Sequence, residues 1–464
     1  MSTPWTQPTQ LPELDLGFLP AIACWNQWKA LCQKDRDQQR LELTLQRGPE
    51  SISEFSIPLL QSTHQQAEFN NRVSERIIKF LLWSRGGHTL TLNGPPEVVS
   101  GLRSHFADSP CGQFDADMMG NRIYLRPFAI EESGNPGKAR EKSSPLGRNL
   151  DGCRIGFDLG ASDRKIAAVI DGKAVFSEEM VWDPLPQTDP EWHFTKIMES
   201  LRLAAEHLPR VDAIGGSSAG VYVDNEVRVA SLFRGISPEQ FNTHIRPIFH
   251  RIRREWNDIP FEVVNDGEVT ALAGSMALDR PGVLGIAMGS SLAVGYVNQE
   301  GNIRPWLNEL AFCPIDWQDH AHRDEWSGDL GCGVQYFSQQ AVGRLLKPAG
   351  IDLPESMKLP EKLVEVQKLM AAGDDRAASI YRSIGTYLGY AIPYYREFYD
   401  FNYLLVLGRV LTGEGGEIIL TKAREILDSQ FPDVSEAVKY HIPDETEKRH
   451  GQAIAAASLP GSAQ

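Results

Sequence analysis

The sequence is poor in cysteine and has no long apolar segment. Six of its 464 residues are cysteines, and no two of them are spaced as Cys-x-x-Cys. This pattern argues against a disulfide framework and against a cysteine-based zinc site. No stretch of about 18 apolar residues occurs, so we expect no membrane span. The first residues contain no basic segment followed by an apolar run, so we expect no signal peptide and a cytoplasmic protein.

The sequence also has fewer basic than acidic residues. The chain has 46 Lys and Arg residues against 61 Asp and Glu residues, a formal net charge of −15. Such a protein repels the phosphate backbone of nucleic acid unless a basic patch is segregated. Basic residues gather only in short clusters such as Arg251–Arg254 and Lys448–His450, which are typical of solvated helix faces. We therefore expect no nucleic-acid partner. The hydrophobic content of 42% indicates an ordinary globular protein, and the length indicates two or three domains.

The first part of the chain, residues 1–135, predicts a small α/β module of unknown role. Alternating apolar residues predict four strands, at residues 40–45, 54–60, 88–92 and 122–130. Amphipathic patterns predict two helices, at residues 68–84 and 95–106. Residues 131–151 are rich in Gly, Pro, Ser and charge, which predicts a linker. Because strands dominate, we expect this module to cover the substrate or to support oligomerisation rather than to read DNA.

After the linker, strands alternate with helices. Short apolar strands that end in glycine-bearing loops are predicted at residues 154–160, 165–171, 213–220, 261–266, 283–298 and 404–410. Helices are predicted at residues 191–207 and 241–256 and over most of 330–400. Alternation of this kind predicts α/β sheets whose ligand-binding loops gather at the strand ends. We place one lobe at 151–280 and a second at 281–464.

The first chemical motif is FDLGASDRK. Asp158 ends an apolar strand, and Gly160, Ala161 and Ser162 allow backbone N–H groups to approach an anion closely. Lys165 adds a positive charge. An acid, small residues and a base suit a metal-bridged phosphate. The alternative is a plain β-hairpin whose glycine serves the turn.

The second motif is VVNDGE. Asp266 follows an apolar strand, so its carboxylate is expected in a partly desolvated place where it can accept a proton from a substrate hydroxyl. Asn265 can donate and accept hydrogen bonds to a polyol. The alternative is an Asn-Asp-Gly turn or a helix N-cap, which this tripeptide also suits.

Two further glycine-bearing loops complete the set. Gly289, Ser290 and Ser291 form a tight turn between apolar strands and could hold a second phosphate, or could be a simple β-turn. Gly408 and Gly413 would let the chain pass over a flat ligand such as adenine, or could belong to a flexible connection.

In their order along residues 151–460, these segments resemble the ROK family (repressors, unassigned frames and sugar kinases) of the actin/hexokinase/Hsp70 ATPase superfamily. Asp158-Leu159-Gly160-Ala161-Ser162 resembles the family's Asp-x-Gly-Gly-Thr phosphate loop, and VVNDGE resembles its Glu-Asn-Asp-Ala-Asn segment. Gly289-Ser290-Ser291 resembles the second phosphate loop, and Asn308-Glu309-Leu310-Ala311-Phe312 resembles the Gly-Glu-Ile-Gly-His segment. The resemblance implies an α/β, duplicated ribonuclease-H-like two-lobe fold, to which this chain adds its N-terminal module.

The resemblance also implies an ATP-dependent sugar kinase that uses Mg²⁺ and forms a homodimer. Asp266 would be the general base, and Asp158 would hold Mg²⁺ through water. The nucleotide and its phosphates would be bound by Asp158, Gly160, Ala161, Ser162, Lys165, Gly289, Ser290, Ser291, Gly408 and Gly413. The sugar would be bound by Ser231, Asn265, Asp266, Asn308 and Glu309.

Several residues depart from the family pattern. Phe312 replaces a histidine that touches sugar and zinc, and only Cys332 remains of the zinc cysteines, so we expect no zinc. Ser231 stands in place of a sugar-binding asparagine, Arg409 in place of a glycine, and Glu268 in place of an asparagine. These departures leave open a sugar-sensing regulator on the same scaffold, and a phosphotransferase acting on an amino sugar, polyol or sugar acid.

Overall fold

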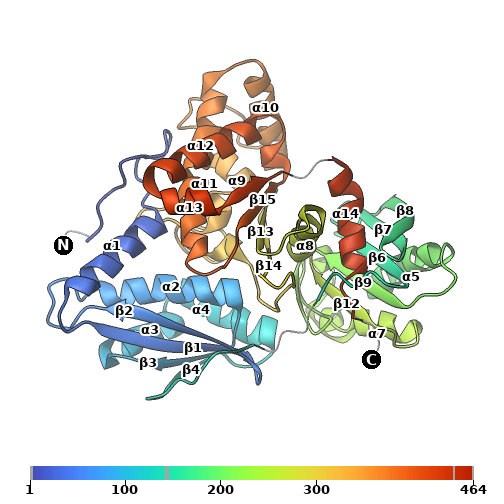
Figure 1. The fold of residues 1–464 in the computed structure, drawn as a ribbon, viewed down its shortest axis with the longest axis horizontal. Coiled ribbons are helices and arrows are strands. Elements are labelled where there is room, and N and C mark those ends of the chain that lie inside the picture. The colour runs from blue at the N-terminus through green and yellow to red at the C-terminus, as the bar shows by residue number, and fades with distance from the viewer. Residues whose placement is uncertain (1–3, 142–145, 443–444, 462–464) are drawn as a thin grey trace.

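The computed structural model describes residues 4–141, 146–442 and 445–461. It contains an N-terminal α/β module and two lobes that each carry a β-sheet (Figure 1). Within these residues, no helix combines the length and the apolar composition that crossing a membrane requires.

The N-terminal module is a five-stranded sheet in the order β4-β3-β1-β2-β5, with helices packed against it. Its elements are α1 (Ala21–Lys34), β1 (Gln39–Gly48), β2 (Ser51–Leu59), α2 (Phe69–Arg85), β3 (Thr89–Asn93), α3 (Pro96–Asp108), α4 (Pro110–Asp117), a π-helix (Met118–Tyr124), β4 (Ala129–Glu132) and β5 (Arg140–Glu141). Strand β1 pairs antiparallel with both β2 and β3, while β3 and β4 are parallel. The alternation that predicted β1 is real, because Leu41, Leu43 and Leu45 are all buried.

Several features of this module differ from the sequence prediction. Helices α1 and α4 were not predicted, and β5 lies within the predicted linker at 131–151. The strand predicted at 122–130 is wrong over its first part, because Met118–Tyr124 is helical and only β4 is extended. Met118, Met119 and Ile123 bury one face of the π-helix, and Leu125 adopts a left-handed φ of 54° that turns the chain before β4.

The first lobe has a five-stranded sheet in the order β12-β9-β6-β7-β8 and a separate β10-β11 hairpin. Its elements are β6 (Cys153–Leu159), β7 (Asp163–Ile170), β8 (Lys173–Val181), α5 (Pro190–Ala205), β9 (Ala213–Ser218), β10 (Val221–Val223), β11 (Glu226–Val229), a 3₁₀ turn (Ser231–Phe233), α6 (Pro238–Gln240), a π-turn (Phe241–Ile245), α7 (Ile248–Glu255) and β12 (Phe261–Asn265). The single helix predicted at 241–256 is interrupted before α7, where Pro247 cannot donate a backbone hydrogen bond.

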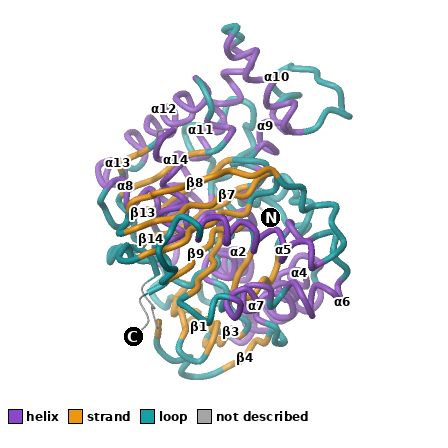
Figure 2. The backbone as a smooth tube through the Cα atoms, turned by 90° about the vertical axis from the view of Figure 1, so that its right-hand side faces the viewer, coloured by secondary structure: helices purple, strands orange, loops and turns teal. Residues whose placement is uncertain are grey.

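The second lobe has a four-stranded sheet in the order β14-β13-β15-β16, surrounded by helices. Its elements are α8 (Asp266–Leu278), β13 (Val283–Met288), β14 (Leu292–Val297), 3₁₀ turns at Leu310–Phe312 and Gly333–Gln335, α9 (Gln339–Leu345), α10 (Leu359–Ala371), α11 (Asp375–Arg396), β15 (Tyr403–Leu407), a 3₁₀ turn (Arg409–Leu411), α12 (Glu414–Gln430), α13 (Pro432–Ala437) and β16 (Lys439–His441). Helix α10 projects from the rest of the molecule (Figure 2).

The last helix, α14 (Glu445–Ala457), returns to the first lobe and packs on β6 and β9 (Figure 1). Two glycines make this approach possible. A Cβ atom at Gly156 would lie 1.9 Å from the carbonyl oxygen of Ala453, and one at Gly215 would lie 1.7 Å from that of Ala456. Glycine is therefore required at both strand positions for the helix to sit so close.

The two lobes differ in how their cores are built. The first lobe has a cluster of buried side chains of its own, which includes Phe157, Phe249 and Phe261. The main core of the second lobe continues into the N-terminal module, so that Phe80 of α2 and Tyr394 of α11 belong to one cluster. The N-terminal module is therefore packed into the second lobe as part of the same core.

Candidate active site

Three parallel strands of the first lobe end at one edge of the sheet. Leu159 of β6, Ser218 of β9 and Asn265 of β12 are aligned in register. The turn that follows β6 and the helix that follows β12 therefore start at the same edge, which is where open α/β sheets bind ligands.

Asp266 is the first residue of α8. The Asn265 side chain caps this helix: its Oδ1 accepts a hydrogen bond from the Gly267 N–H at 2.8 Å, and its Nδ2 donates to the Gly220 carbonyl at 2.7 Å. The N-cap alternative for this tripeptide is therefore real. Burial, together with a smaller contribution from the negative charge of Asp158, raises the pKa of Asp266 to about 6. Asp158 and Asp266 are thus close enough to influence each other.

The first predicted phosphate loop is a tight turn between β6 and β7. Asp158 lies opposite Lys165 in the antiparallel register, so the two side chains share a face. The Gly160 N–H donates to the Asp163 carbonyl at 2.9 Å and closes the turn, while Ala161 and Ser162 are exposed. Burial raises the pKa of Asp158. The turn presents small exposed residues beside two carboxylates, Asp158 and Asp163, and the Lys165 ammonium group, which lies 3.6 Å from Asp163.

The second predicted phosphate loop is the turn between β13 and β14. The Gly289 N–H donates to the Ser291 carbonyl at 2.9 Å, and Ser290 and Ser291 are exposed. Gly408 follows the parallel neighbour β15 with a φ of +107°, and a Cβ there would lie 2.4 Å from the Met288 carbonyl oxygen. The structure thus brings these two loops together. Gly413 is exposed at the start of α12.

Glu309 interacts electrostatically with Asp266. Burial, with a smaller contribution from the charge of Asp266, raises the pKa of Glu309 to about 7. Asp266 is therefore influenced by Asp158 and in turn influences Glu309, and the three carboxyl groups come from β6, α8 and the loop after β14. Ser231 is exposed at the end of the β10-β11 hairpin.

The polar groups of the Asn308 side chain are occupied by other protein side chains. Asn308 is 2% exposed; its Nδ2 donates to Glu268 Oε1, and its Oδ1 accepts a hydrogen bond from the Tyr399 hydroxyl at 2.8 Å. Glu268 is 5% exposed, and burial raises its pKa to about 8. Sequence reasoning singled out Glu268 only as a departure and missed Tyr399 altogether.

Phe312 is packed against the N-terminal module. Its ring stacks on Trp83 of α2 with a centroid distance of 4.1 Å, and Phe114 lies 5.8 Å away. Trp83 was not predicted as a site residue, because nothing in the pattern of α2 links it to a loop more than 220 positions later in the sequence. It fits the apolar face of an ordinary amphipathic helix.

Asp158, Asp266 and Glu309 do not form a protein-only metal site. Among the described residues, no group of three or more His, Cys, Asp and Glu side chains is arranged to hold a metal. A single carboxylate such as Asp158 fits Mg²⁺, which keeps most of its water and binds substrate phosphates instead.

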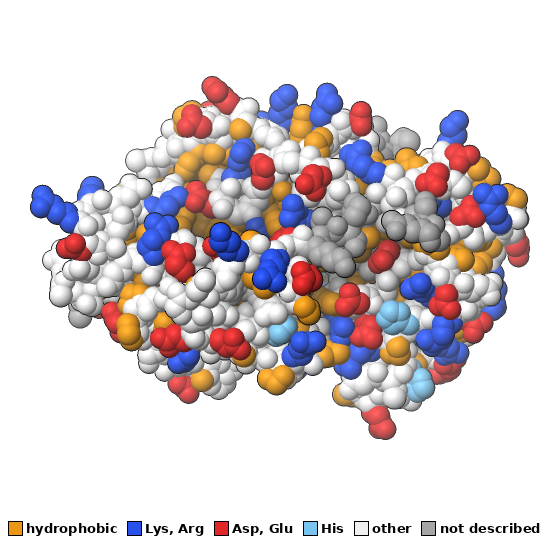
Figure 3. Space-filling view, turned by 60° about the horizontal axis from the view of Figure 1, so that its bottom comes forward, with side chains coloured by type: hydrophobic (Ala, Val, Ile, Leu, Met, Phe, Trp, Pro, Cys, Tyr) orange, Lys and Arg blue, Asp and Glu red, His pale blue; other side chains and the backbone are white. Residues whose placement is uncertain are grey.

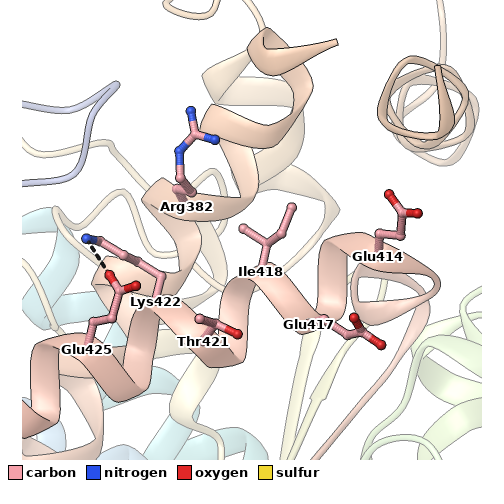
Figure 4. Close-up of a pocket in the computed structure, with 7 residues that line it drawn as sticks. All are labelled: Arg382, Glu414, Glu417, Ile418, Thr421, Lys422 and Glu425. Carbon is pink, nitrogen blue, oxygen red and sulfur yellow. Dashed lines mark hydrogen bonds and ion pairs between the residues drawn. The ribbon is translucent and has the colours of Figure 1, made fainter. Parts of the chain in front are cut away.

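The second lobe also has a hollow on its outer surface. It lies between α11 and α12 and is lined by Arg382, Glu414, Glu417, Ile418, Thr421, Lys422 and Glu425 (Figure 4). Its lining thus combines three glutamates with two basic residues. On the face shown in Figure 3, acidic and basic side chains are interspersed.

No family model and no curated protein matches the chain. Several solved structures match about two thirds of it, and two of them illustrate the likeness. A ROK hexokinase from Thermus thermophilus is 18% identical with a TM-score of 0.52, and the match covers 66% of this chain and 97% of that one. A ROK family transcriptional regulator, a homologue of the E. coli MLC protein, is 19% identical with a TM-score of 0.50, and the match covers 67% and 79%.

About two thirds of the chain has the ROK fold. The predicted two-lobe, hexokinase-like architecture is thereby confirmed. A kinase and a regulator share this fold, so the fold alone does not decide between the two activities.

Proposed function

We propose that the protein is an ATP-dependent kinase of a hexose or related sugar. The observation that supports this most is Asp266, a half-buried carboxyl group that starts α8 at the sheet edge where β6 also ends, and that interacts electrostatically with Asp158 and with Glu309. A general base is most effective when its pKa lies near the working pH, and a value of about 6 meets this condition.

Each residue then has one task. Asp266 accepts the proton of the attacking sugar hydroxyl, while Glu309 orients the neighbouring hydroxyls and Asn265 holds the start of α8 through its capping hydrogen bonds. Mg-ATP supplies the phosphoryl group. The exposed turn residues Ala161, Ser162, Ser290 and Ser291 would offer backbone N–H groups to its phosphates, Asp158 would hold Mg²⁺, and Lys165 would offset negative charge.

The test is ADP release from Mg-ATP with a panel of hexoses, amino sugars, polyols and sugar acids. We expect release with one substrate class, and Asp266→Asn should lower turnover at least about a hundredfold while the fold is kept. Circular dichroism and the melting temperature check the fold. A variant with near-wild-type turnover would remove Asp266 from the role of base.

A sugar-sensing regulator is the second candidate. It is favoured by the Asn308 side chain, whose polar groups are occupied by Glu268 and Tyr399, and by Phe312, which Trp83 covers. A sugar that raises the melting temperature without any ADP release would support this candidate instead.

A further inference from the structure

The C-terminal end of α2 is joined to the loop that carries Glu309. The last carbonyl groups of a helix have no partner within the helix. Two of these groups in α2 are used by the loop: the Trp83 carbonyl accepts a hydrogen bond from the Glu309 N–H at 2.9 Å, and the Ser84 carbonyl accepts one from the Asn308 N–H at 3.0 Å. The N-terminal module thus fixes the backbone of both residues.

The next residue of α2 strengthens the same junction. Arg85 is buried, and its guanidinium group lies 3.5 Å from the centre of the Trp306 ring and 4.8 Å from that of Tyr399. It also donates a hydrogen bond to the carbonyl of Phe398. Both the chain before the loop and the end of α11 are therefore in contact with α2.

Asn308 is held from two further directions. It adopts a left-handed φ of 51°, a conformation that asparagine tolerates better than most residues. Glu268, two residues after Asp266 in α8, accepts from its amide group, and Tyr399 donates to it. Because Glu309 is the next residue in the chain, any movement of Asn308 moves Glu309 relative to Asp266.

We propose that Glu268 and Tyr399 are positioning residues that hold Glu309 beside Asp266. Together with the end of α2, they form a set of contacts around Asn308 and Glu309 that is called the clamp below. The N-terminal module then helps to position a residue of the substrate site. The inference rests on the proposed function, and it deepens that function by assigning a role to the module and to two residues outside the predicted site.

The chain offers a matched pair of variants for the test. Tyr399→Phe removes the hydroxyl that binds Asn308. Tyr395→Phe removes a hydroxyl that is equally buried, four residues earlier at the end of α11, and that has no hydrogen-bond partner among the described residues. With the full-length protein, we expect Tyr399→Phe to raise the KM for sugar roughly tenfold and to leave the KM for ATP unchanged.

A second readout does not depend on turnover. Hydrogen exchange of the Asn308 and Glu309 amides should become faster in Tyr399→Phe and should stay at the wild-type rate in Tyr395→Phe. Glu268→Ala should act like Tyr399→Phe, and Glu268→Gln, which keeps an acceptor for the Asn308 amide, should restore most of the loss.

The outcomes separate the two proposals. If the wild-type protein phosphorylates no sugar, the proposed function fails, while the exchange rates still decide whether the clamp exists. If Tyr399→Phe matches Tyr395→Phe in both KM and exchange, or if it raises the KM values for sugar and ATP equally, the clamp is overturned.

Discussion

The two sides of the proposed site are held in different ways. On the phosphate side, Ala161, Ser162, Ser290 and Ser291 lie exposed in short turns closed by their own backbone hydrogen bonds. On the sugar side, Asn308 is buried and contacted by α2, by α8 and by the end of α11. A turn that closes on itself needs few outside contacts, whereas a loop in an unusual conformation persists only when its surroundings hold it. Mutations should therefore affect stability mainly on the sugar side.

The largest loss of stability is expected from a substitution at Lys79 of α2. Lys79 is 1% exposed, and its Nζ lies 2.9 Å from Asp115 and 3.0 Å from Asp329. Burial alone would lower the pKa of Lys79, but the two carboxylates raise it, so the ammonium group stays charged. Lys79→Met leaves both carboxylates buried without this partner. We expect a loss of roughly 3–5 kcal/mol in the free energy of unfolding, measured by urea denaturation.

The control is Lys422→Met. Lys422 pairs with Glu425 at 3.0 Å on the surface of α12, as the dashed line in Figure 4 shows. An exposed pair of this kind contributes about 0–1 kcal/mol. Equal losses for the two variants would show that the buried charges do not stabilise the junction between the N-terminal module and the second lobe.

The same contrast explains what the sequence could predict. Asp158, Asn265 and Asp266 each follow an apolar strand, so a local pattern was enough to place them, and the parallel register brings them to one edge. Trp83 contacts Glu309 from 226 positions away, and Tyr399 contacts Asn308 from 91 positions away. No local pattern carries such a contact, because it depends on how whole elements pack.

The N-terminal module shows a second reason for failure. Residues 122–130 alternate in polarity like a strand, yet Met118–Tyr124 forms a helix that buries Met119 and Ile123. Short apolar runs fit either structure, and burial against neighbouring elements decides between them. The strand prediction could not include that burial, since the shared core with the second lobe is itself a long-range feature.

Substitution of Glu268 should have an intermediate effect on the free energy of unfolding, and this effect should depend on pH. Its pKa is about 8 in the folded protein, above the ordinary value of about 4.3 for an exposed glutamate. Between these values the folded state binds more protons than the unfolded state, so this group makes the wild-type protein less stable as pH rises. Glu268→Gln does not titrate. We expect its stability relative to wild type to increase from pH 5 to pH 8.5, by at most about 1.4 kcal/mol per pH unit.

Urea denaturation of both proteins at pH 5, 7 and 8.5 measures this difference. The groups that face Glu268 are the Asn308 amide, the Tyr296 N–H and, at longer range, the Glu309 carboxyl, which also titrates in this window. Glu309 is present in both proteins, so most of its contribution cancels in the comparison. A stability difference that stays constant with pH would mean that Glu268 is ionised throughout the range.

The smallest effect on stability is expected on the phosphate side, at Lys165. Its Nζ lies 3.6 Å from Asp163, and both side chains are about one-third exposed, so Lys165→Ala should change the free energy of unfolding by less than about 1 kcal/mol. The same variant should raise the KM for ATP about tenfold, because it removes the ammonium group that shares a face with Asp158. The KM for sugar should not change. A variant that raised the KM for sugar and left that for ATP unchanged would place Lys165 on the sugar side and remove the distinction between the two halves of the site.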